Sequence, residues 1–172
     1  MKIHSVARFI ISVVLPAFLL SVLLSCVEEK MPQAEKIIGE WKGKVQFKSG
    51  MFASIKDLEF MRVFNYGGTL TESSNYDGVP PVPPAYGIWK KTGEKTYEAK
   101  YEFYTTNLPG SFEDLKSSGG FSPSGYGIIT ETITLNADRN SYSSLIMMAL
   151  FDKTGNHISV DEADAEAIRM EF

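Results

Sequence analysis

The chain has 172 residues, of which 44% are hydrophobic and 22% are charged, and its formal net charge at pH 7 is −4. A mildly acidic chain is a poor ligand for a phosphate backbone, which argues against nucleic-acid binding. The single cysteine, Cys26, and two histidines are too few for a zinc site built from histidine and cysteine ligands. We therefore expect no metal and no cofactor.

The N-terminus has the layout of a bacterial lipoprotein signal. Lys2 and Arg8 precede an uncharged run over residues 9–27, and the run contains the sequence LLSC, which ends at Cys26. A basic start followed by an apolar stretch is typical of a secretory signal peptide. The closing tetrapeptide resembles the lipobox, which predicts a signal peptide over residues 1–25.

The lipobox resemblance implies that Cys26 carries diacylglycerol on its sulfur and a fatty acid such as palmitate on its amine. Several acyl chains hold a protein on a membrane, whereas one chain binds only marginally. The expected location is the cell envelope, outside the cytoplasm, and the outer membrane if the host has one. A transmembrane signal anchor is the alternative, but Pro16 interrupts the apolar run and the only cysteine stands at the lipidation position.

Residues 26–37 are mostly polar and are interpreted as a lipidated tether, followed by one domain over residues 38–172. In this domain apolar and polar residues alternate with a period of two, which is typical of strands with one buried and one wet face. The predicted strands cover residues 40–48, 57–65, 69–75, 85–91, 96–105, 127–136, 141–151 and 157–172.

Eight strands without a long crossover favour an all-β fold, an eight-stranded antiparallel up-and-down barrel, which leaves no exposed sheet edge. A two-sheet sandwich is the structural alternative. The last strand has a potential break near residues 161–164, and residues 161–167 are the only weak helix candidate.

The chain shows no motif for a catalytic triad, a phosphate site or a calcium loop. His157 lies beside a turn, and no glycine-rich loop has the spacing of a phosphate site. The acidic residues at 161–166 lack the spacing of a calcium loop and are interpreted as solvated.

Connections of two lengths alternate along the chain, which predicts a cup. In a meander, every second connection lies at the same end of the barrel. One end is therefore closed by tight turns and the other is ringed by long loops, with the short 152–156 turn as an exception. The tight turns are 66–68, 92–95 and 136–140, and the long loops are 49–56, 76–84 and 106–126.

The sequence GEW at residues 39–41 resembles the Gly-x-Trp element of lipocalins and related calycins. In that family an arginine of the last strand packs over the tryptophan, and Arg169 has the corresponding position. A closer resemblance is to small secreted lipocalin-like proteins of bacteria, and it rests on residues 64–72, on residues 87–93 with Tyr97, and on Phe151-Asp152 with Gly155-Asn156. The likeness covers most of residues 37–172 and implies the fold; because function in that group is largely unassigned, it implies no activity.

Aromatic residues collect in and near the long loops and on the inner face of the strand at 96–105. They are candidates to line an apolar pocket, although side chains can also fill an eight-stranded barrel completely. The candidate ligand-binding residues are Phe52, Tyr76, Tyr86, Tyr97, Tyr101, Phe103, Phe112, Phe121 and Tyr126.

Two interior pairs are predicted from strand register. A three-residue turn at 66–68 places Arg62 opposite Glu72 on the inner face, where a charge needs a partner. Removing Glu72 is then expected to leave Arg62 unpaired. The second pair is Arg169 over the ring of Trp41, at the closed end.

The sequence leaves three functions open. The first is a membrane-anchored cup that binds a small apolar or amphipathic ligand, and the second is a structural or interaction lipoprotein with a filled barrel. In the second case the proline-rich segment 79–84 would be a partner ligand rather than a stiff connector. The third is an enzyme that uses Glu72 or Glu131 as acid or base.

Overall fold

The computed structural model describes residues 35–77, 82–118 and 120–171. The predicted signal peptide, the predicted lipidation site Cys26 and most of the predicted tether lie outside these residues. Among the described residues, no helix is long and apolar enough to cross a membrane.

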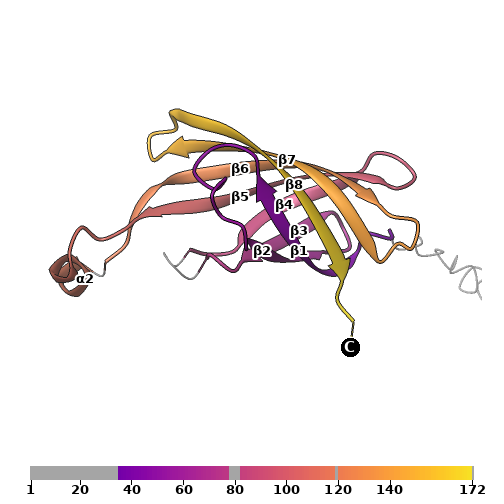
Figure 1. Cartoon of the computed structure of the whole chain (residues 1–172), viewed down its shortest axis with the longest axis horizontal. Helices are drawn as coiled ribbons and strands as arrows, with labels where there is room; N and C mark the ends of the chain where they lie inside the picture. Colours follow the sequence, from indigo (N-terminus) through magenta and orange to yellow (C-terminus); the bar gives the residue numbers. More distant parts are fainter. Residues whose placement is uncertain (1–34, 78–81, 119, 172) are drawn as a thin grey trace, which may run out of the picture. The chain divides into compact units, whose positions relative to one another are not determined.

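Eight antiparallel strands form a closed barrel in sequence order, and the last strand pairs with the first (Figure 1). This confirms the predicted fold class and removes the sandwich alternative. The elements are β1 Gly39–Phe47, β2 Glu59–Phe64, β3 Thr69–Ser74, β4 Ala85–Lys91, β5 Thr96–Asn107, α2 Phe112–Ser118, β6 Ser122–Leu135, β7 Ser141–Asp152 and β8 His157–Arg169.

The alternation of apolar and polar residues in the sequence corresponds to the alternation of inward and outward side chains in the barrel wall. In β5, for example, Tyr97, Ala99 and Tyr101 are buried, while Glu98, Lys100 and Glu102 are exposed. Burying one face of every strand removes the apolar side chains from water, and closure pairs both edges of each strand.

Large aromatic side chains fill the end of the barrel where β1 begins. Trp41, Phe64, Tyr97 and Tyr142 are almost fully buried there. The rings of Trp41 and Tyr142 are 4.9 Å apart, and the indole nitrogen of Trp41 donates to the carbonyl of Ile37 at 2.8 Å. This aromatic layer seals the closed end.

Arg169 lies over Trp41, with its guanidinium carbon 4.3 Å from the ring centroid. Trp41 and Arg169 are register partners between β1 and β8, as the strand order predicts. The guanidinium also donates to the carbonyls of Ile38, at 2.9 Å, and Lys36. Arg169 therefore ties the segment before β1 to the closed end.

We expect Arg169→Ala to lower the free energy of unfolding by more than about 1 kcal/mol, because it removes the cation–π contact and two hydrogen bonds to backbone carbonyls. A double-mutant cycle with Trp41→Phe, measured by urea unfolding, should show coupling between the two residues. Lys100→Ala removes an exposed cation and is the control. Strictly additive losses for Arg169 and Trp41 would contradict the packing role.

The connections follow the predicted division. Gly67 and Gly68 of the β2–β3 turn have φ values of +97° and +87°, which L side chains rarely adopt. Asn65 N donates to Thr69 O at 2.8 Å across this turn, so the three-residue loop sets the expected register. The longer loops between β1 and β2, β3 and β4, and β5 and β6 share the opposite end of the barrel with the β7–β8 turn.

The structure corrects two local predictions. β8 runs without a break and is not helical between 161 and 167, because Asp161, Ala163, Ala165 and Ala167 all face inward and the strand pairs on both sides. A short helix, α2, lies instead within the segment predicted as a 106–126 loop, and its first turn is capped by Ser111 Oγ, which accepts from Asp114 N.

Candidate ligand-binding site

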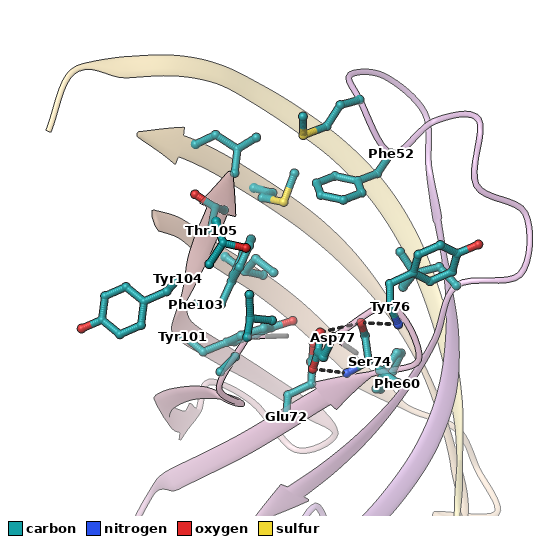
Figure 2. A pocket seen from close by; sticks show the side chains of 18 of the residues that line it. Phe52, Phe60, Glu72, Ser74, Tyr76, Asp77, Tyr101, Phe103, Tyr104 and Thr105 are labelled. Atoms are coloured by element: carbon teal, nitrogen blue, oxygen red, sulfur yellow. Dashed lines mark hydrogen bonds between the residues drawn. The ribbon is translucent and has the colours of Figure 1, made fainter. Parts of the chain in front are cut away.

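A cavity of about 520 Å³ occupies the end of the barrel where the long loops lie (Figure 2). This volume lies within the usual range for small-molecule sites. Its wall is mainly apolar, and strands from all around the barrel contribute to it. The wall includes Val45, Phe47, Phe60, Ile129, Ile146 and Met148.

The floor of the cavity is polar. Its lining reaches Arg62, Glu72 and Tyr101, but none of Trp41, Phe64 and the other residues of the aromatic layer beneath. Figure 2 shows Glu72 and Phe52 at opposite ends of the group of lining side chains. The barrel is thus filled in its closed half and open in the other.

Arg62 forms hydrogen bonds and ion pairs with the other polar residues of the floor. Its Nε donates to Glu72 Oε2 at 2.9 Å, and its Nη2 makes a second bond to the same oxygen. Nη2 also donates to the hydroxyl of Tyr101 at 2.7 Å, and Nη1 to that of Tyr142 at 3.2 Å. Nη1 lies 2.7 Å from Glu131 Oε2, which makes a second ion pair. Every nitrogen of the guanidinium therefore has an oxygen partner.

Glu131 comes from β6, on another side of the barrel from Arg62, and its side chain is fully buried. It accepts hydrogen bonds from Ser144 Oγ at 2.5 Å and from the hydroxyl of Tyr101 at 3.0 Å. One buried cation is thus shared by two carboxylates, Glu131 and Glu72.

Burial and charge both act on this network. Burial opposes the charge of Arg62, but the attraction of Glu131 and Glu72 outweighs it and raises the pKa of the guanidinium well above its ordinary value. Burial likewise raises the pKa values of Tyr101 and Tyr142, which keeps both hydroxyls protonated. Burial also raises the pKa of Glu72, despite the opposing attraction of Arg62.

Because Glu131 also pairs with Arg62, it changes the effect of Glu72→Gln that we expect on stability. The sequence predicts that this change strands Arg62, but in the structure Arg62 keeps its ion pair with Glu131. We expect a loss of less than about 1 kcal/mol at pH 7, because a neutral amide still accepts a hydrogen bond and no charge is left unpaired.

The pH dependence has a definite sign. Because folding raises the pKa of Glu72 above its ordinary 4.5, its contribution to stability is complete below pH 4.5 and is lost as pH rises through the folded-state pKa. The wild type should therefore gain stability relative to Glu72→Gln between pH 7 and pH 4.5, measured by urea unfolding at each pH. A constant difference between the two proteins would contradict this account.

Of the nine aromatic candidates, the structure brings four to the cavity: Phe52, Tyr76, Tyr101 and Phe103. The other five do not line it. Tyr97 lies below the floor, where it packs edge-on against Trp89 with ring centroids 5.9 Å apart.

The remaining four candidates lie elsewhere for reasons of strand parity and local structure. Tyr86 is exposed on the outer face of β4, and Phe112 is exposed on α2. Tyr126 alternates with the inward Gly125 and Gly127 of β6 and stacks on Phe151. Phe121 precedes β6 and is not part of the cavity wall.

Other sequence features also have defined places. His157 is exposed and packs edge-on against Phe151. Asp161 is not solvated as predicted: it is 3% exposed, on the inner face of β8. Of the proline-rich segment 79–84, Val82 and Pro83 line the cavity, and residues 79–81 lie outside the described residues.

Sequence reasoning missed most of the aliphatic wall and the full extent of the floor. It identified Glu131 as an interior carboxylate but did not join it to Arg62, because the two residues lie on strands that are not neighbours. A signal for the apolar wall was present in β6, where Ile129 and Ile133 share a face opposite Thr130 and Thr132. In β7 the neighbours of Ile146 are apolar as well, so alternation does not mark its inward face.

A scan against protein-family models, a search of curated proteins and a search of solved structures each returned no match.

Proposed function

We propose that the protein is a lipid-anchored component of the cell envelope whose cup-shaped barrel binds a small apolar or amphipathic ligand. The observation that carries this proposal is the open cavity of about 520 Å³ in a barrel whose other half is filled. A wall of aliphatic and aromatic side chains above a few convergent polar groups is typical of a ligand site.

The rim of the cavity supports a ligand that enters from this end. Met51, Leu108 and Ile158 line the cavity and are 69%, 66% and 63% exposed. Apolar side chains around an opening cost free energy in water, and a bound apolar molecule would cover part of them.

The anchor rests on the lipobox resemblance at Cys26. The described chain approaches the barrel at its closed end, where Ile37 is buried and Arg169 bonds the carbonyls of Lys36 and Ile38. A lipidated tether would thus join the domain at the end opposite the mouth.

The interaction-lipoprotein alternative requires a barrel interior without room for a ligand, so the cavity favours the binding function. Catalysis by Glu72 or Glu131 is less well supported, because both carboxylates are bonded to Arg62. The experiment that tests the binding function is native mass spectrometry of the full lipidated chain, released from nanodiscs of zwitterionic phosphatidylcholine after addition of dodecan-1-ol. We expect a one-to-one adduct, and a chain that takes up no alcohol would contradict the proposal.

Cys26→Ala should abolish attachment of lipid, because the thioether and the acylated amine both require the cysteine. Metabolic labelling with a radioactive fatty acid, followed by membrane fractionation, measures the effect. Ser25→Ala, which keeps a small residue before the cysteine, is the control and should label normally. If Cys26→Ala labels as strongly as the wild type, the chain is not a lipoprotein.

A further inference from the structure

The floor of the cavity has no free donor for an anionic headgroup. Arg62 is the only cation that lines the cavity among the described residues. Its three nitrogens already bond or pair with Glu72, Glu131, Tyr101 and Tyr142. A ligand carboxylate would have to displace one of the internal carboxylates, and it would be repelled by the other.

The interior as a whole carries more negative than positive charge. Besides Arg62, the charged residues that line the cavity are Glu72 and Asp77. Glu131 lies directly behind the floor, and Asp161 is buried on the inner face of β8. The cavity lining thus holds one cation and two carboxylates, and Arg62 also shares its charge with the buried Glu131. Low-dielectric walls strengthen the negative potential of such an excess.

Glu72 is the carboxylate of the network that a ligand can reach. Its side chain is 14% exposed, whereas those of Arg62 and Glu131 are 1% and 0% exposed. Both bonds from Arg62 go to Oε2 of Glu72, so Oε1 takes part in neither. Glu72 thus lines the cavity with a partly accessible side chain while Arg62 holds its Oε2.

Thr106 is a further polar residue of the cavity wall. The hydroxyl oxygen of Thr106 is buried without a hydrogen-bond partner among the described residues, and Thr106 lines the cavity.

We propose that the cup selects an apolar chain with a cationic amine headgroup, which lies on the floor against Glu72 while the chain extends along the apolar wall to the mouth. This inference rests on the proposed function and names its ligand class. An ammonium group beside Glu72 would restore the charge balance of the floor and donate charge-assisted hydrogen bonds to it. It would also offset the burial that raises the pKa of Glu72.

The test compares dodecylamine, dodecan-1-ol and dodecanoate, which share one chain and differ in the headgroup. Each is titrated at pH 7 into the full lipidated chain in phosphatidylcholine nanodiscs, and the bound fraction is measured by native mass spectrometry. We expect the amine to bind at least about tenfold more tightly than the carboxylate, with the alcohol between them. Glu72→Gln should reduce this preference about tenfold, whereas Glu98→Gln, on the outer face of β5, should leave it unchanged.

The comparison between variants removes the effect of unequal partition of the three probes into lipid, since that partition is the same for each protein. If the alcohol binds but the amine has no advantage, or if Glu72→Gln leaves the advantage intact, the headgroup inference is overturned and the apolar cup stands. Tighter binding of dodecanoate also overturns the inference. If none of the three probes binds, the inference and the proposed function both fail.

Discussion

Arg62→Met should lower the free energy of unfolding by about 3–5 kcal/mol, the usual cost of removing one partner from a buried ion pair. Methionine preserves much of the length of the side chain but removes the charge that Glu72 and Glu131 share. Glu131 would remain fully buried with only hydroxyl donors, from Tyr101 and Ser144. Urea unfolding at pH 7 measures the loss.

Two comparisons make this result specific to the network. Lys100→Met removes an exposed cation from β5, and it should change stability by less than about 0.5 kcal/mol. Adding Glu131→Leu to Arg62→Met removes the stranded carboxylate and should recover part of the loss, because an apolar replacement of a buried ion pair is often tolerated. A loss for Arg62→Met no larger than that for Lys100→Met would contradict the ionic role of the floor.

The barrel could be predicted from the sequence because alternation and turn chemistry act locally. The eight strands follow from period-two patterns, and β4 has the predicted bounds, Ala85–Lys91. The pairing of Arg62 with Glu72 follows from the turn between β2 and β3, since its length fixes which residues face one another.

Position along the barrel axis could not be predicted in the same way. Tyr97 and Tyr101 lie on the same face of β5, and alternation treats them alike. They are four residues apart, which is about 13 Å along a strand. Tyr97 belongs to the packed closed end and Tyr101 to the cavity. Which inward residues meet an open space depends on where the packed layer ends.

The contact between Arg62 and Glu131 is a second feature that could not be predicted from the sequence. It joins β2 to β6 across the interior, and its geometry depends on the tilt and stagger of the closed barrel rather than on any single turn. The strand predicted at 157–172 is observed as β8, but the weak helix candidate at 161–167 was wrong, because pairing with β7 and β1 overrides the high helix propensity of its alanines and glutamates.

Ala85→Trp should abolish ligand binding while the protein stays folded. Ala85 lies on the inner face of β4, lines the cavity and is 7% exposed. The larger side chain would project into existing empty space, so it would occupy the ligand volume rather than displace packed neighbours. Ile88→Trp, on the outer face of the same strand, is the matched control because Ile88 is 62% exposed.

The central claim is that the open half of the barrel binds an apolar ligand. It is tested most directly by native mass spectrometry of wild type, Ala85→Trp and Ile88→Trp in phosphatidylcholine nanodiscs with added dodecan-1-ol, after circular dichroism shows that all three are folded. The account predicts a one-to-one adduct for wild type and Ile88→Trp, and none for Ala85→Trp. Equal binding by a folded Ala85→Trp protein would place the ligand outside the cavity and contradict the claim.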